Sequence, residues 1–320
     1  GMMKETKHIN RDEVIEDFWL RLDNAAIMYP ALLNREFTTV FRISAWLKRP
    51  VKIRAFFHAV RRVENRFPYY KMQLKKGFFW YYLEHNNIPV YVQEDQGELC
   101  RRFNKDTDHG LLFRVLVRGR RISVEFSHIL TDGTGALEFL KSLLVTYLKE
   151  QGVQVPGGLN YLSPDEPVSA EELEDSFHQY FKKDLPHKIR MPRAFHLPYK
   201  VRNPRPFDTV QVTLSLGRVK ERARAFSVSM TEYLVGIYLY TLQDVYKDMD
   251  ARQKRKSQKL LRIQVPVNLR KIFPSKSARN FTLFVLPGID LRLGYYSLPE
   301  IIRKVHHLMQ LERDEKLISR

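Results

Sequence analysis

The stretch FSHILTDG, residues 126 to 133, places a histidine four residues before an aspartate and a glycine directly after it. Imidazole titrates near neutral pH, so one interpretation makes His128 a catalytic general acid or base. A second interpretation stays open, in which His128 is a core histidine and Asp132 caps a helix. The spacing alone does not separate the two, because a histidine and an aspartate at this distance are common.

The pattern around the motif predicts the elements that position it. Residues 111 to 128 alternate apolar and other side chains on two arms, with a turn near Gly119, and predict a β-hairpin. The strand period places His128 at the end of the second arm, on the apolar face of Ile122, Val124 and Phe126. Leucines at helical spacing after Gly133 predict a helix. The motif therefore lies at a strand-to-helix corner, a common location for a site on a rigid scaffold.

Strands and helices alternate along the rest of the chain. The residue types favour further strands at 37–48, 78–83, 88–93, 208–216, 261–267 and 281–286. They favour helices at 52–66 and at about 217–226, a helix with Thr231 as its cap, and a last helix after Pro299. Residues 150–206 hold eight prolines and predict an extended crossover, in which SAEELEDSFHQYFKK forms one short helix. We expect a mixed α/β fold.

The composition limits the classes of function. The 320 residues carry a net charge of +18, which favours anionic partners such as phosphates or an acidic membrane surface. The sequence has no zinc-finger, basic-zipper or RNA-binding signature. Its positive charge is then the one feature in favour of nucleic-acid binding, and charge alone is weak evidence. The single cysteine, Cys100, excludes a disulfide within the chain and a zinc site built mainly on cysteine. The chain shows no transmembrane run and no secretory signal, and we expect a cytoplasmic location.

Four segments together resemble the coenzyme A-dependent acyltransferase superfamily, which includes chloramphenicol acetyltransferase and the condensation domains of nonribosomal peptide synthesis. FSHILTDG is similar to its His-x-x-x-Asp-Gly signature. The opening strand and helix of the superfamily resemble FRISAWLKRPVKIRAFFHAVRRVENRFPYYKMQLKKG. The helix that opens its second half resembles VSMTEYLVGIYLYTL. VPVNLRKIFPSKSARNF is similar to a segment of bacterial alcohol-acetyltransferase-like members.

This resemblance implies two chloramphenicol-acetyltransferase-like halves, each a mixed sheet flanked by helices, with a tunnel between them. Residues 1–150 would form the half that carries the motif, 151–206 the proline-rich crossover and 207–320 the second half. His128 would be the general base and Asp132 an architectural partner of Arg270, for which an exposed positive charge is the alternative. Gly133 would allow a sharp turn, and Asn280 would line the tunnel. No metal is implied.

The resemblance also implies the reaction, in which an acyl group passes from acyl-CoA or an acyl carrier protein to a small alcohol or amine. Acyl-CoA would be a co-substrate, and no cofactor would be bound permanently. A homodimer and a peripheral contact with an anionic membrane are further partners to consider, and no specific nucleic acid is expected. Ser127 stands where condensation domains usually carry a second histidine, and the chain ends at Arg320, earlier than family members. The second half therefore looks incomplete, which favours the alternative of a weakly active or inactive relative that binds a ligand or partner.

Overall fold

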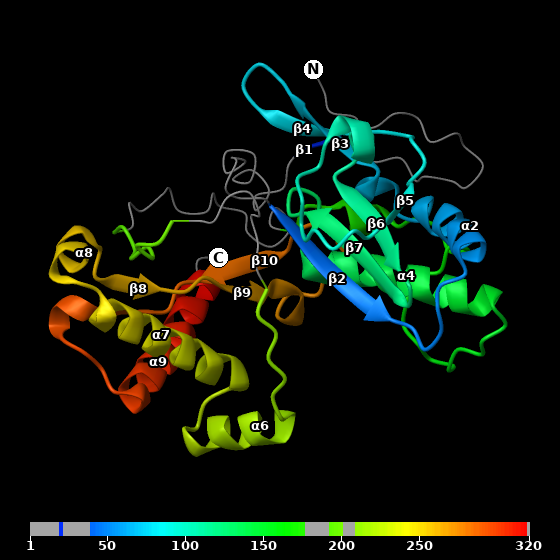
Figure 1. Cartoon of the computed structure of the whole chain (residues 1–320). Helices are drawn as coiled ribbons and strands as arrows, with labels where there is room; N and C mark the ends of the chain where they lie inside the picture. Colours follow the sequence, from blue (N-terminus) through cyan, green and yellow to red (C-terminus); the bar gives the residue numbers. More distant parts are fainter. Residues whose placement is uncertain (1–18, 22–38, 177–191, 201–208, 319–320) are drawn as a thin grey trace. The chain divides into compact units, whose positions relative to one another are not determined.

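The computed structural model describes residues 19–21, 39–176, 192–200 and 209–318. It divides into two compact units (Figure 1). Unit 1 holds Gly1–Gln179 together with Leu269–Phe281, and unit 2 holds Tyr180–Asn268 together with Thr282–Arg320. The segment Leu269–Phe281 thus belongs to unit 1, although it connects two strands of unit 2. The sequence-based division assigned all of residues 207–320 to the second half and did not predict that this segment belongs to unit 1.

The main sheet of unit 1 has four strands. Their order is β2-β7-β6-β5, with the bounds β2 Val40–Trp46, β7 Arg121–Ser127, β6 Phe113–Arg118 and β5 Val92–Glu94. β5 runs parallel to β6, and the other pairs are antiparallel, so the sheet is mixed as expected. β6 and β7 form the predicted hairpin, and Gly119 takes the positive φ of 58° that its tight turn requires.

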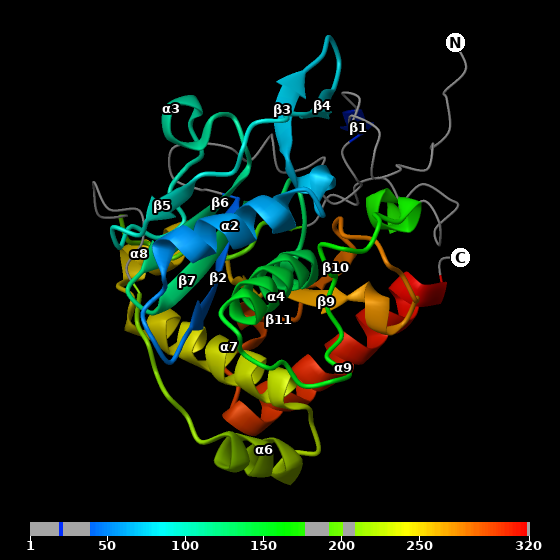
Figure 2. The same cartoon turned by 90° about the vertical axis from the view of Figure 1, so that its right-hand side faces the viewer.

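Two helices cover the apolar face of this sheet. They are α2 (Ile53–Glu64) and α4 (Gly133–Glu150), and they lie side by side in Figure 2. The core between helices and sheet contains fully buried residues from each element, among them Phe56, Val124, Phe126 and Phe139. Burying side chains of this size stabilises the folded chain by roughly 1.5–3 kcal/mol each. The site described below therefore rests on a packed layer.

The opposite face of the sheet carries buried charges. Arg42 donates from Nε to Glu125 and from Nη1 to Asp95, each at 2.8 Å. Arg114, which is 1% exposed, lies with its Nε 3.4 Å from Asp108 and 3.5 Å from Glu125. Burial lowers the pKa of the Arg114 guanidinium, and the two carboxylates act against that shift. These oppositely charged partners offset the cost of removing the charges from water.

A second sheet of unit 1 is small and antiparallel. Its order is β1-β4-β3, with β1 Trp19–Arg21, β4 Tyr81–His85 and β3 Met72–Lys76. Short helical turns complete the unit, namely η2 Pro68–Tyr70, α3 Lys105–Asp108, η3 Ala170–Leu173 and η4 Leu269–Lys271. The turn η3 connects the crossover to the core, because Glu172 accepts hydrogen bonds from Arg66 at 2.7 and 2.9 Å. Residues 177–183 of the expected crossover helix lie outside the described residues.

Unit 2 packs the two long helices α7 (Met230–Asp248) and α9 (Leu298–Ile318) against each other. A Cβ added at Gly236 would lie 2.7 Å from Cγ1 of Ile302, so glycine permits the close approach of the two helices there. The described strands form two antiparallel pairs, β9 Val265–Asn268 with β10 Thr282–Val285 and β8 Leu260–Arg262 with β11 Gly288–Asp290. The remaining elements are α6 Leu216–Ala225, α8 Ala251–Lys256 and η5 Leu291–Leu293.

Three sequence-based predictions of secondary structure were wrong in part. Residues 209–215 form no strand, since Val210 and Val212 are 88% and 73% exposed and no other described segment packs on their apolar face. The strands predicted at 78–83 and 88–93 begin later, at Tyr81 and Val92. The cap of α7 is Ser229 rather than Thr231, because Ser229 and Glu232 exchange the hydrogen bonds of a capping box.

Candidate functional site

His128 is the first residue after β7, at the end of the buried face that the hairpin pattern predicted. Its backbone N–H donates to the carbonyl of Thr39 at 2.7 Å, and its ring centroid lies 4.4 Å from that of Phe41. The residue is partly exposed. Burial lowers the pKa of His128 below its ordinary 6.5, although the charge of Asp132 and a hydrogen bond with the Thr131 backbone act in the opposite direction. The imidazole is therefore mainly neutral at pH 7 and can accept a proton.

Asp132 uses both carboxylate oxygens. Oδ1 accepts from the backbone N–H of Gly135 at 3.3 Å and thereby caps α4. Oδ2 accepts from Nη1 of Arg270 at 2.7 Å and from the backbone N–H of Phe281 at 2.8 Å. The two interpretations that the sequence left open for Asp132, a helix cap and an ion-pair partner, both hold. The side chain is 5% exposed, so these donors replace water as its partners.

Arg270 binds three acceptors, and the alternative of an exposed charge is wrong. Besides Asp132, its guanidinium donates to the carbonyls of Ser277 at 3.1 Å and Arg279 at 2.5 Å. Its side chain is 10% exposed. The expected ion pair with Asp132 is present, and both residues lie in unit 1, because the segment Leu269–Phe281 belongs to that unit. The guanidinium organises the loop Leu269–Phe281 around a single carboxylate.

Asn280 supports the backbone of His128. It is 2% exposed, and its Nδ2 donates to the carbonyl of His128 at 2.8 Å. Because the Thr39 carbonyl accepts from the N–H of His128 and Asn280 donates to its carbonyl, the peptide groups on both sides of His128 are fixed. Contact of Asn280 with a substrate stays a prediction.

Gly133 does not have the role that the sequence suggested. It is the first residue of α4, its φ is not positive, and an added Cβ would meet nothing within 4 Å. The demanding position is Gly135, where a Cβ would lie 2.6 Å from the carbonyl oxygen of Ala278 and closer still to the hydroxyls of Thr131 and Tyr70. The sharp corner thus depends on close packing at Gly135 rather than on backbone freedom at Gly133.

Sequence reasoning missed the contacts that surround Gly135. The carbonyl oxygen of Ala278 accepts hydrogen bonds from Thr131 Oγ1 at 2.6 Å and from the Tyr70 hydroxyl at 2.8 Å. Both hydroxyls are buried, and burial raises the pKa of Tyr70 well above its ordinary value, so its proton stays in place. No local pattern signals these contacts, because they join residues more than a hundred positions apart.

Neither a thiolate nor a metal cluster is found beside this site. Burial raises the pKa of the Cys100 thiol to about 11, so the thiol is protonated at neutral pH and is a poor nucleophile. Across the part of the chain that the structure describes, no group of three or more His, Cys, Asp or Glu side chains is arranged to hold a metal ion. Among the described residues of this corner, His128 has the side chain whose ordinary pKa is near neutral pH.

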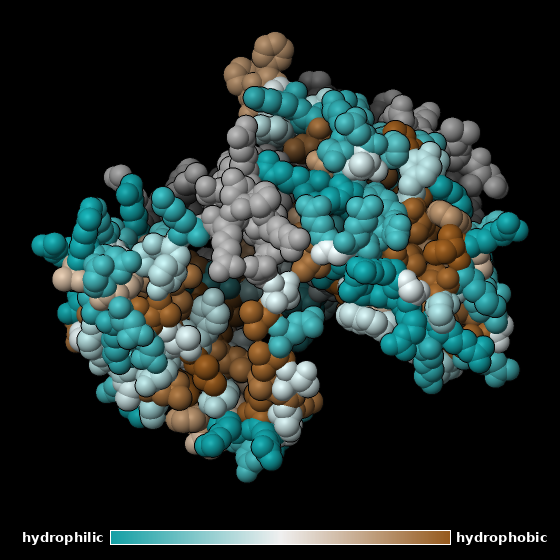
Figure 3. All heavy atoms as spheres, in the orientation of Figure 1, coloured by the Kyte–Doolittle hydropathy of each residue, from teal (hydrophilic) through white to brown (hydrophobic). Residues whose placement is uncertain are grey.

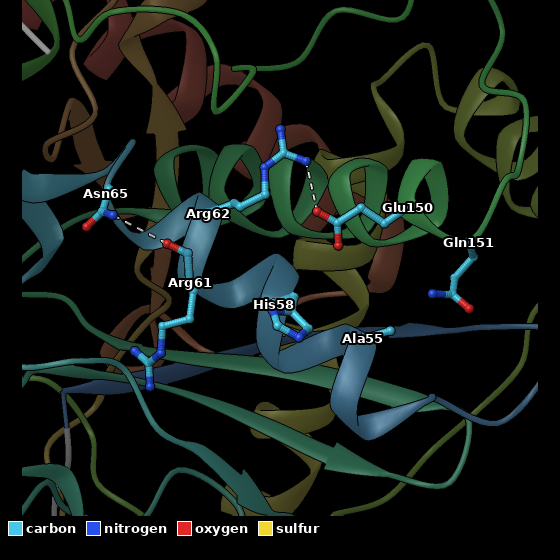
Figure 4. Close-up of a pocket in the computed structure, with 7 residues that line it drawn as sticks. All are labelled: Ala55, His58, Arg61, Arg62, Asn65, Glu150 and Gln151. Atoms are coloured by element: carbon cyan, nitrogen blue, oxygen red, sulfur yellow. Dashed lines mark hydrogen bonds and ion pairs between the residues drawn. The ribbon is translucent and has the colours of Figure 1, made fainter.

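A surface pocket of about 640 Å³ lies elsewhere in unit 1, beside α2 and the end of α4 (Figure 4). It is lined by Ala55, His58, Arg61, Arg62, Asn65, Glu150 and Gln151. Arg62 points toward Glu150 and donates to it at 2.8 Å, and Asn65 donates to the carbonyl of Arg61 at 3.5 Å. The pocket does not contain His128, and its cations are largely engaged by neighbours.

Neither a protein-family model nor a curated protein matches the sequence. Solved structures do match it. The complex of the X-domain and OxyB from teicoplanin biosynthesis has a TM-score of 0.57 at 12% identity, over 99% of this chain and 74% of that chain. The condensation domain of the monacolin K polyketide synthase MokA has a TM-score of 0.55 at 11% identity, over 94% and 74% of the two chains.

The chain has a condensation-domain-like fold. This fold is of the chloramphenicol-acetyltransferase kind that the four sequence segments resemble. SgcC5 from Streptomyces globisporus is a further match, with a TM-score of 0.54 at 13% identity, over 93% of this chain and 75% of that chain. Identities at this level establish the architecture and leave the reaction to be argued from the residues.

Proposed function

We propose that this protein is an acyltransferase that moves an acyl group from a thioester to an alcohol or amine, with His128 as the general base. The observation that carries the proposal is the neutral, partly exposed imidazole at the end of β7, whose backbone is held from both sides. Such a group accepts a proton near pH 7 and is already oriented, which lowers the entropic cost of reaching the transition state.

The proposed step is a direct transfer. The acceptor oxygen or nitrogen attacks the thioester carbonyl while His128 takes its proton. The acyl–oxygen or acyl–nitrogen bond forms, the carbon–sulfur bond breaks, and the thiolate recovers the proton from the imidazolium. Acyl-CoA or an acyl carrier protein is the proposed donor, and a small alcohol, as in alcohol acetyltransferases, is the first acceptor to test. Asp132 and Arg270 position the corner and stay out of the proton transfer.

The test is release of free thiol from acyl-CoAs of several chain lengths, with and without small alcohols and amines. We expect acceptor-dependent thiol release and formation of the ester or amide. His128→Ala should lower the rate by about two to four orders of magnitude. His58→Ala, which alters an exposed histidine on α2, is the matched control and should retain the parent rate. Equal rates for the parent and His128→Ala would exclude the proposed mechanism.

A second candidate is a binding protein that performs no acyl transfer. The similarity to the X-domain, which was solved in complex with OxyB, favours this candidate. It predicts that acyl-CoA and acceptors yield no product with the parent protein, while a protein partner binds equally to the parent and to His128→Ala. Product formation that depends on His128 decides for the enzyme.

A further inference from the structure

The hairpin β3–β4 carries a group of exposed aromatic residues at its tip. The sequence KKGFFWYY turns through Gly77, whose backbone N–H donates to the carbonyl of Trp80 at 2.7 Å. Phe78 is 98% exposed, Phe79 90% and Trp80 59%. Apolar atoms project at the end of this hairpin in the space-filling view (Figure 3), where Figure 1 shows the loop between β3 and β4.

These rings do not form a small core of their own. The ring centroids of Phe78 and Phe79 are 6.3 Å apart, and those of Phe79 and Trp80 are 6.5 Å apart. These distances are typical of neighbouring aromatic rings, yet Phe78 and Phe79 remain almost fully exposed. Burial of an aromatic side chain removes about 150–250 Å² of its surface from water. The exposed rings at this tip do not gain the free energy of such burial. Contiguous apolar surface of this extent on a folded protein marks an interaction site.

The base of the hairpin is fixed. Met72 and Leu83 are buried at 0% and 2% exposure, and β4 pairs with β3 on one side and β1 on the other. Just before β3, Lys71 is buried with its Nζ 3.7 Å from Glu64 of α2. The tip is therefore presented by a hairpin whose lower part belongs to the packed core, which reduces the entropy lost when the tip binds.

Polarity changes in order from the tip to the base. The two phenylalanines come first, and then Trp80 and Tyr81, whose rings combine an apolar body with a polar group. The exposed Lys75 and Lys76 follow on the adjoining strand. Lys76 lies over the Tyr81 ring at 6.0 Å, and Lys75 is 3.7 Å from Glu84. Three residues of strand span about 10 Å, which is close to the depth at which interfacial segments enter a bilayer.

We propose that this hairpin tip inserts into the surface of a lipid bilayer that contains anionic headgroups. Phe78 and Phe79 enter the acyl region, Trp80 and Tyr81 occupy the headgroup boundary that such rings prefer, and the two lysines contact lipid phosphates. A nucleic acid would not bury two phenylalanines at the far end of a hairpin, and an acidic protein surface would not match the stepwise order of polarity. The helices of the described residues include none with the length and hydropathy of a transmembrane span.

The experiment uses the full chain with Trp19→Phe and Trp46→Phe, which leaves Trp80 as the one remaining tryptophan of three. Its emission is recorded with vesicles of phosphatidylcholine, with and without phosphatidylglycerol, and binding is measured by flotation. We expect a blue shift and co-flotation with the anionic vesicles. Phe78→Ser with Phe79→Ser should weaken binding at least about tenfold. Lys75→Gln with Lys76→Gln should remove most of the preference for anionic vesicles.

Val210→Ser with Val212→Ser is the matched control, because these residues are equally exposed but lie in unit 2. It should bind vesicles like the parent, and unchanged melting temperatures should show that all variants are folded. The proposal is overturned if Trp80 emission does not shift or if the two phenylalanines can be replaced without loss of binding. It is also overturned if the control weakens binding equally. Loss of a dimer in the phenylalanine variant, without vesicle binding by the parent, would assign the tip to self-association.

Discussion

Asn280 donates a hydrogen bond of 2.8 Å from its side-chain amide to the main-chain carbonyl of His128, 152 residues earlier in the chain. The bond ends on the backbone of the proposed base and not on its imidazole. Together with the N–H that His128 donates to Thr39, it fixes the direction in which the side chain leaves the strand. The loop Leu269–Phe281 therefore contributes to the site by orienting His128.

Replacement of Asn280 by alanine tests this arrangement. The part-buried carbonyl of His128 would lose this donor, so we expect the free energy of unfolding to fall by about 1–3 kcal/mol. We also expect acyl transfer to slow while the pH midpoint of the rate stays near that of the parent, because the titrating group is unchanged. Urea unfolding and a pH–rate profile measure the two effects. Full activity in Asn280→Ala would show that the backbone bond does not orient the base.

The pH dependence of acyl transfer should reflect the lowered pKa of His128. Since burial favours the neutral ring, the base form persists below pH 6.5, and the rate should decline only as the pH falls through the lowered pKa. The nearby charge of Asp132 raises this pKa, so Asp132→Asn should move the acidic midpoint further down. A profile of kcat/KM against pH for both proteins gives the two midpoints. A midpoint above 6.5 in the parent would contradict the assignment.

The ion pair between Asp132 and Arg270 should be important for stability. Each side chain is at most 10% exposed, and removing one partner leaves the other charge buried, which typically costs about 3–5 kcal/mol. We expect Asp132→Ala and Arg270→Ala each to lower the free energy of unfolding by an amount in this range. The control is Lys276→Ala in the same loop, whose partner Glu171 is 54% exposed and whose own side chain is 74% exposed. That change should be small, about 0.5 kcal/mol or less.

Replacement by alanine should lower the stability of the fold at Gly135 and raise it at Gly133. At Gly135 the new methyl group would press against the Ala278 carbonyl and two buried hydroxyls, and overpacking of this kind costs about 1–3 kcal/mol. At Gly133 the methyl group would enter open space at the start of a helix, where alanine reduces the freedom of the unfolded chain and adds up to about 1 kcal/mol. Thermal unfolding of the two variants separates them. Equal melting temperatures would refute the close packing at Gly135.

The sequence predicted the elements whose signals are local. The hairpin of β6 and β7, the helices α2 and α4 and the corner at His128 all follow from hydrophobic period and turn chemistry within each segment. The strand predicted at 208–216 has the same alternation as β7, yet Val210 and Val212 are solvent-exposed, because alternation specifies a face and not its partner. Ser229 could have been identified as a cap from its spacing to Glu232.

Local sequence signals could not predict the contacts that complete the site. Apart from the pair of Asp132 and Arg270, which the family resemblance supplied, they join distant segments through backbone groups. The carbonyl of Ala278 accepts from Tyr70 and Thr131, and the N–H of Phe281 donates to Asp132. Any residue type carries these groups, so their use leaves no trace in the sequence. The exposed tip of β3–β4 was interpreted as part of a strand for a related reason, since aromatic runs are typical of both.

The discontinuity of unit 1 has a consequence for biosynthesis. The Phe281 N–H that Asp132 binds is 149 residues further along the chain, which at about 5–20 residues per second corresponds to roughly 7–30 s of translation. During this interval the carboxylate can cap α4 but lacks both Arg270 and Phe281. We therefore expect the corner that holds His128 to be the last part of unit 1 to reach its final form, after the strands and helices around it have packed. We therefore expect the rate of translation, rather than the rate of local folding, to determine when the candidate site is complete.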